Sequence, residues 1–198
     1  MYDQSKLSEL IRFARIDAGS TVIDVYPGDG DSTRLFSDIV GPEGRVFSFV
    51  SAEVAHFKND PVGRNQTLSK EPGRGNVEAA SADLVTMPEV TQPADVLWLH
   101  LFYHDLHTAL IQARGATAAD FNRAVYEHLK PGGSYVIVDH AAAVGGARAT
   151  RMFGRRLRRL ALYWMRTAPS SQTRTIRTRS RFSITRSRAR PIASLIDF

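Results

Sequence analysis

The chain has no cysteine among its 198 residues. This absence excludes a disulfide scaffold, a thiolate zinc site, an iron–sulfur cluster and a cysteine nucleophile. The sequence also lacks any run of about 18 apolar residues, the length that a membrane-spanning helix needs, so we expect no membrane partner. Residues 1–14 carry charges at Asp3, Lys6, Glu9 and Arg12 instead of the apolar stretch of a signal peptide. This pattern favours the cytoplasm.

Acidic residues are nearly absent from the C-terminal part of the chain. Residues 141–198 contain 14 Arg, no Lys and a single acid, Asp197, whereas residues 1–140 contain 12 Lys and Arg against 19 Asp and Glu. The net charge of +6 is therefore the sum of a negative first part and a strongly positive tail. Such an asymmetry of charge is typical of a boundary between two segments of different composition. We predict a folded domain over residues 1–146 and an Arg-rich tail over residues 147–198.

The first part alternates between helical and strand patterns. Apolar residues at helical spacing from Leu7 to Ala14 predict a helix over residues 4–15. A capping box formed by Thr117 and Asp120 predicts the start of another helix. Short, almost entirely apolar runs between the helices are typical of buried parallel strands. The pattern predicts an α/β, Rossmann-like fold with a mainly parallel sheet and helices on both faces. The predicted strands lie near residues 20–25, 45–50, 76–80, 95–100 and 134–139.

Residues that can bind a ligand or take part in catalysis follow several of these strands. The first strand ends at Asp24 and leads into a turn with Gly28 and Gly30, and the fourth leads into Tyr103-His104-Asp105. In open α/β sheets, ligands bind beyond the carboxyl ends of the strands. Glycines let the backbone approach a ligand closely, and the following helix points its N–H groups at it. This edge of the sheet is therefore the predicted site of an adenosine-type cofactor.

These segments resemble the class I S-adenosylmethionine-dependent methyltransferases, and within them a bacterial branch of predicted methyltransferases. The resemblance covers about residues 4–146. Its motifs are Asp24 to Gly30, Tyr103-His104-Asp105, and Leu129 to Gly133 followed by Asp139-His140. The resemblance implies a Rossmann-like methyltransferase fold, S-adenosyl-L-methionine as cofactor and methyl transfer to an acceptor. The sequence identifies neither the acceptor nor the oligomeric state.

The resemblance also implies site residues. Tyr26 stands where the superfamily has its first glycine, and Val50 stands where it usually has an acid that binds the ribose hydroxyls. Glu53 is a candidate replacement for that acid, and Asp83 is a candidate contact for the adenine amine. Because of Tyr26 and Val50, an alternative is a catalytically inactive, cofactor-binding protein. The cofactor-binding residues that the resemblance implies are Asp24, Tyr26, Gly28, Gly30, Glu53, Asp83 and Tyr103.

His104 is the candidate general base, because imidazole can take a proton near neutral pH. Asp105, in a turn, is a candidate for orienting the ring. His100, His104 and His107 have helical metal-ligand spacing, but they fall across a strand end and a loop. We therefore expect no metal.

The tail allows three interpretations. The first is a nucleic-acid-binding arm, and the second is a basic amphipathic membrane segment over residues 151–165. The third is a segment that is not the family's own C-terminus. We favour the third, because the family has two further strands after strand five and we find no pattern for them here. Arg without Lys, mixed with Ser, Thr, Ala and Pro, is typical of a GC-rich gene read out of frame. For residues 175–186, a shifted frame permits a sequence similar to the family's C-terminal segment.

The sequence thus predicts that the C-terminal strands are missing and that the tail is disordered or forms a peripheral helix. Its charge predicts non-specific binding of nucleic acid that depends on salt concentration. A nucleic-acid-binding protein that acts through this tail remains a second alternative function.

Overall fold

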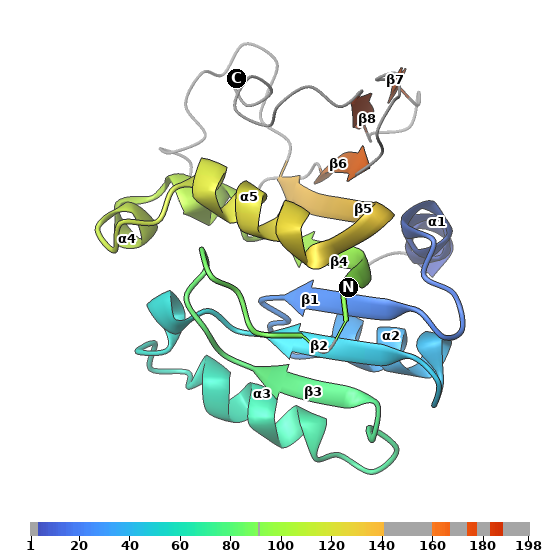
Figure 1. Cartoon of the computed structure of the whole chain (residues 1–198), viewed down its shortest axis with the longest axis horizontal. Helices are drawn as coiled ribbons and strands as arrows, with labels where there is room; N and C mark the ends of the chain where they lie inside the picture. Colours follow the sequence, from blue (N-terminus) through green and yellow to red (C-terminus); the bar gives the residue numbers. More distant parts are fainter. Residues whose placement is uncertain (1–3, 91, 141–159, 167–173, 178–182, 188–198) are drawn as a thin grey trace.

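The computed structural model describes residues 4–90, 92–140, 160–166, 174–177 and 183–187 of the chain. Its first five strands form one sheet in which every neighbouring pair is parallel. The predicted parallel sheet is confirmed, and each strand overlaps its predicted range. These strands are β1 (Thr21–Val25), β2 (Arg45–Phe49), β3 (Val77–Ala80), β4 (Ala94–His100) and β5 (Leu129–His140), and their order is β3-β2-β1-β4-β5 (Figure 1).

Helices precede β1 and lie between most of these strands, as the alternating pattern predicts. The predicted helix start at Thr117 is confirmed, because the Thr117 hydroxyl accepts a hydrogen bond from the Asp120 backbone N–H at 3.1 Å. Two short 3₁₀ helices follow β2 and β4 directly, at the carboxyl ends of these strands. The helices are α1 (Gln4–Ala14), α2 (Asp31–Val40), η1 (Ala52–Val54), α3 (Pro61–Ser69), η2 (Tyr103–His107), α4 (Ala109–Gln112) and α5 (Ala118–His128).

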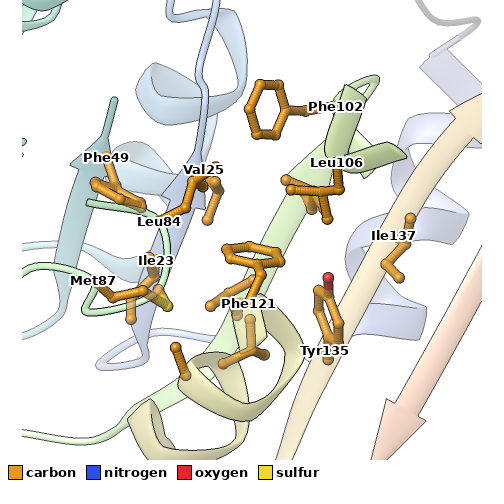
Figure 2. Close-up of a cluster of buried hydrophobic side chains, with 14 of the residues drawn as sticks. Ile23, Val25, Phe49, Leu84, Met87, Phe102, Leu106, Phe121, Tyr135 and Ile137 are labelled. Carbon is orange, nitrogen blue, oxygen red and sulfur yellow. The ribbon is translucent and has the colours of Figure 1, made fainter. Parts of the chain in front are cut away.

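The two faces of the sheet support two separate apolar clusters. Successive residues of a strand point to opposite faces, so Ile23 joins one cluster and its neighbour Val22 joins the other. Figure 2 shows the first cluster, in which Phe121 of α5 packs with side chains of β1 and β5. On the other face, Leu10 of α1 and Phe36 of α2 cover the sheet. Burial on both faces explains why the strands are apolar throughout.

Three further strands extend the sheet in the described part of the C-terminal region. They are β6 (Leu160–Arg166), β7 (Arg174–Arg177) and β8 (Ser183–Ser187), and the complete order is β3-β2-β1-β4-β5-β6-β8-β7. β6 pairs with β5 in the antiparallel sense, from Ser134 opposite Arg166 to His140 opposite Leu160.

The expectation of missing C-terminal strands, with at most a peripheral helix in the tail, does not hold for residues 160–166, which overlap the amphipathic segment 151–165 and form β6. The short apolar segment Leu160–Trp164 fits a strand as well as a helix, and the unpaired edge of β5 decides between them. The remaining residues 151–159 lie outside the described residues. The domain boundary near residue 146 and the shifted reading frame stay predictions.

Within the described residues, no helix combines the length and the apolar character that crossing a membrane requires.

Candidate functional site

A cleft opens at the carboxyl edge of the sheet, where the sequence predicts a ligand. Two loops and one helix form its walls. The loop after β1 contributes three residues, Val50 follows β2, and the rest come from the segment that leads into α3 and from its first turns. The lining residues are Tyr26, Gly28, Asp29, Val50, Asn59, Pro61 and Arg64. Among the predicted cofactor residues, Tyr26 and Gly28 belong to this lining.

The two predicted glycines of this loop have different tasks. Both have a positive φ, 61° at Gly28 and 83° at Gly30, a conformation that glycine adopts without strain. A Cβ atom at Gly28 would meet no other atom within 4 Å, whereas one at Gly30 would lie 1.7 Å from Cδ1 of Leu68. Gly28 therefore borders open space in the cleft, and Gly30 permits close packing of the loop against α3.

Tyr26 also has a positive φ, 56°. For a residue with a side chain this conformation costs roughly 1–2 kcal/mol. The backbone at this position therefore has the shape that a glycine would give it. The ring of Tyr26 stacks on Phe102, with 4.9 Å between the ring centroids and 26° between the planes.

Asp24 lies beneath this loop and is 1% exposed. A chain of polar side chains runs from it to α3: Oδ2 lies 2.6 Å from the Thr33 hydroxyl, which lies 3.2 Å from the Ser48 hydroxyl. The Ser48 hydroxyl lies 2.6 Å from Oδ1 of Asn65, and Nδ2 of Asn65 donates to the Ser48 carbonyl. The chain joins β1, α2, β2 and α3.

Two effects act on the ionisation of Asp24 in opposite directions. Burial is the larger effect and raises the pKa of Asp24 to about 7. The Thr33 hydroxyl donates to Oδ2 of Asp24, and this hydrogen bond favours the charged carboxylate. Oδ1 of Asp24 has no hydrogen-bond partner among the described residues.

Glu53 and Asp83, the predicted contacts for the ribose and the adenine, do not line the cleft. The Glu53 side chain is buried, and both of its carboxylate oxygens accept from the Leu84 backbone N–H, at 3.1 and 3.3 Å. This carboxylate holds the turn that follows β3, and Asp83 is exposed in the same turn. Asn59 and Arg64 stand at the cleft instead, and no sequence motif distinguishes them.

An ion pair links two walls of the cleft. Arg64 of α3 pairs with Asp29 of the loop after β1. The side chain of Asp60 caps the start of α3 by accepting from the Gly63 backbone N–H at 3.0 Å. The cap fixes the first turn of α3, and the ion pair ties that turn to the loop.

His104 lies in η2 and is held by Asp139, at the end of β5. Its Nδ1 lies 2.8 Å from Oδ1 of Asp139, and its backbone N–H donates to Oδ2 at 2.8 Å. Nε2 lies 3.6 Å from Oδ1 of Asp105. The hydrogen bond with Asp139 is the largest cause that raises the pKa of His104, and the charges of Asp139 and Asp105 add to it, whereas burial lowers it. Asp139 therefore orients the ring.

Tyr103 turns toward α5, where its hydroxyl accepts a hydrogen bond from Nδ2 of Asn122 at 3.1 Å. It does not line the cleft. In the part of the chain that the structure describes, no group of three or more His, Cys, Asp or Glu residues is placed to hold a metal ion. The arrangement thus combines a cleft for a polar ligand with an oriented imidazole, which can accept a proton through Nε2.

Comparisons with known proteins give similar methyltransferases. No family model matches the chain. It is 32% identical over 133 residues to the ubiquinone/menaquinone biosynthesis C-methyltransferase UbiE of Ectopseudomonas mendocina, over 65% of this chain and 45% of that protein. A Pseudomonas aeruginosa protein of the same name is 31% identical over 130 residues, with the same shares. The chain thus spans under half the length of these curated relatives.

Solved structures show the same fold. A SAM-dependent methyltransferase of Aquifex aeolicus superposes with a TM-score of 0.51 at 19% identity, over 71% of this chain and 74% of the other. A SAM-dependent O-methyltransferase of Thermotoga maritima gives 0.51 at 17% identity, over 72% and 46%.

The first prediction concerns Asp24. Its folded-state pKa lies above the ordinary 3.8, so the stability it contributes is complete below that value and is lost as the pH rises toward 7. Asp24→Asn cannot ionise. We therefore expect the free energy of unfolding of the variant, relative to the wild type, to increase by about 4 kcal/mol between pH 4 and pH 8.

Urea denaturation at several pH values measures this difference. Asp83→Asn removes an exposed carboxylate and serves as the control. A difference between Asp24→Asn and the wild type that stays constant with pH would show that Asp24 is ionised throughout this range.

Proposed function

We propose that the chain is a class I S-adenosylmethionine-dependent methyltransferase and that it transfers a methyl group from S-adenosylmethionine to an acceptor that loses a proton. One observation carries the proposal. A glycine at positive φ opens on a cleft at the carboxyl end of the central strand, and a histidine oriented by a carboxylate follows the neighbouring strand. The residues at the carboxyl edge of the sheet do not indicate which molecule accepts the methyl group.

The residues of the cleft fit the proposed cofactor. At Gly28 a side chain would project into the cleft without touching the protein, which leaves space for a ligand against the backbone. Asn59, Asp29 and Arg64 supply donors and acceptors for ribose hydroxyls and for the charged ends of a methionine group. Bound S-adenosylmethionine would supply an electrophilic methyl group on a sulfonium. The protein mainly aligns the reacting groups.

His104 acts in this proposal as the general base. With Nδ1 donating to Asp139, the lone pair lies on Nε2, which takes the proton of the acceptor. Asp105 stabilises the resulting imidazolium through its charge. The UbiE relatives are named as C-methyltransferases, and methylation at a carbon also ends with loss of a proton. Asp139 is a positioning residue, since it acts through His104.

The cytoplasmic location predicted from the sequence stays a prediction. Tyr26 and Val50 motivate the alternative of an inactive protein that still binds the cofactor. A protein that binds nucleic acid through its tail is the other alternative, and it predicts no affinity for the cofactor.

Isothermal titration calorimetry with S-adenosylmethionine and S-adenosylhomocysteine tests the proposal. The wild type should bind both ligands, and Gly28→Val should abolish binding because its side chain fills the cleft. Gly73→Val is the matched control: Gly73 also has a positive φ, 80°, with nothing within 4 Å of a Cβ, but it precedes β3 at the opposite edge of the sheet.

Both Val variants should lose similar stability, since the cost of the positive φ is shared, and only Gly28→Val should lose the ligands. Absence of binding to the wild type at millimolar ligand would contradict the methyltransferase proposal. If both variants bind the two ligands equally well, the cofactor site does not include Gly28. Binding without methyl transfer to any acceptor would favour the inactive alternative.

A further prediction concerns His104. Because Asp139 is the main cause of its raised pKa, Asp139→Asn should lower that pKa, and Asp105→Asn should lower it less. Titration of the imidazole Cε1 proton by NMR measures both effects without knowledge of the acceptor, and a His104→Gln variant assigns the signal. A larger effect of Asp105→Asn would make Asp105 the orienting residue.

A further inference from the structure

Tyr26 keeps an aromatic side chain at a position whose backbone has the shape typical of glycine. Its φ of 56° is close to the 61° of Gly28 two residues later. A non-glycine residue held in this conformation is an outlier that functional sites often contain. Contacts of the Tyr26 ring must offset this strain.

Phe102, on which the Tyr26 ring stacks, follows a second residue with a positive φ. Leu101 follows β4 with a φ of 53°, and its backbone N–H donates to the Val138 carbonyl at 2.7 Å. Phe102 comes next, is 2% exposed and carries the face on which Tyr26 stacks. In Figure 2 Phe102 stands at the edge of the apolar cluster, beyond Val25, the last residue of β1. Two strained turns, after adjacent parallel strands, thus build the stack.

The half-buried ring of Tyr26 lies between the two parts of the site. It lines the cleft together with Gly28 and Val50. Burial raises the pKa of its hydroxyl, the negative charge of Asp105 raises it further, and the positive charge of Arg64 lowers it. Tyr26 therefore lies within electrostatic range of Arg64 in the cleft wall and of Asp105 beside the His104 ring.

This location is where a methyl donor and an acceptor would meet. The donor carries a positive charge on sulfur before transfer, and the product S-adenosylhomocysteine carries none there. The face of an electron-rich ring attracts a cation within about 6 Å, whereas a neutral thioether contacts aromatic rings more weakly and often at the ring edge. The opposite face of the Tyr26 ring is already covered by Phe102, which leaves one face for a ligand.

We propose that the face of Tyr26 turned to the cleft receives the sulfonium of S-adenosylmethionine and makes the site prefer the methyl donor over S-adenosylhomocysteine. This inference rests on the proposed function, and it assigns to Tyr26 a positioning and discriminating role. Tyr26 stands where the superfamily pattern has a glycine, and in this proposal its ring favours the release of the product S-adenosylhomocysteine.

The experiment compares dissociation constants for the two ligands, measured by calorimetry, in the wild type, Tyr26→Phe and Tyr26→Leu. The ratio of the two constants is the readout, because a purely structural defect weakens both ligands alike. Tyr26→Phe keeps the ring and should keep the ratio. Tyr26→Leu should reduce the preference for S-adenosylmethionine by about 2- to 30-fold, the range of a cation–π contact.

Asp105→Asn is the second comparison, because the charge of Asp105 also favours a cation. A drop of the ratio in Asp105→Asn together with no drop in Tyr26→Leu would overturn the proposal, as would equal weakening of both ligands in Tyr26→Leu. Loss of the preference in Tyr26→Phe as well would assign the effect to the hydroxyl and overturn the role of the ring.

The wild type supplies a measurement that does not depend on the folding of a variant. With ¹³C-labelled tyrosine, the ring signals of Tyr26 should shift more with S-adenosylmethionine than with S-adenosylhomocysteine, and equal shifts would contradict the proposal. If the wild type binds neither ligand, the proposed function fails. If it binds both and Tyr26→Leu leaves the ratio unchanged, only this inference fails.

Discussion

The parallel pairing of β1 with both β2 and β4 is the constraint on which the rest of the structure depends. The chain moves from β1 outward to β2 and β3, then returns to place β4 on the other side of β1. The connection after β1 leads to β2 on one side and the connection after β4 leads to β5 on the other. A crevice forms between two such connections at the carboxyl edge of a parallel sheet. Complete burial of β1 on both faces holds this arrangement.

The two sides of this crevice carry different chemistry. On the β2 side, the loop after β1, Val50 and the start of α3 form a polar cleft, and the chain of hydrogen bonds from Asp24 to Asn65 fixes α3 against the strands beneath it. On the other side, the ends of β4 and β5 bring His104 to Asp139. The stack of Tyr26 on Phe102 crosses from one side to the other. The proposed reaction needs a ligand and a proton acceptor, and the topology places the cleft and His104 at the same edge of the sheet.

The sequence predicts the five parallel strands and the capped helix because their signals are local: apolar runs, helical spacing and a capping box. It also predicts the loop at Gly28, since two glycines after a first strand restrict the conformations available. Asp139 was missed as the partner of His104, because the contact depends on how β4 and β5 are paired. Glu53 has a suitable residue type and spacing, but its carboxylate turns to the Leu84 N–H. The segment at β6 fits two local patterns, and the open edge of β5 selects the strand.

A crystal structure of the chain with bound S-adenosylhomocysteine tests the central claim most directly, because it locates the ligand without reference to an acceptor. We predict electron density for the ligand against the backbone of Gly28, between Val50 and the start of α3, with the sulfur on the side of Tyr26. Density at another edge of the sheet, or an ordered ligand that leaves this cleft empty, would contradict the account.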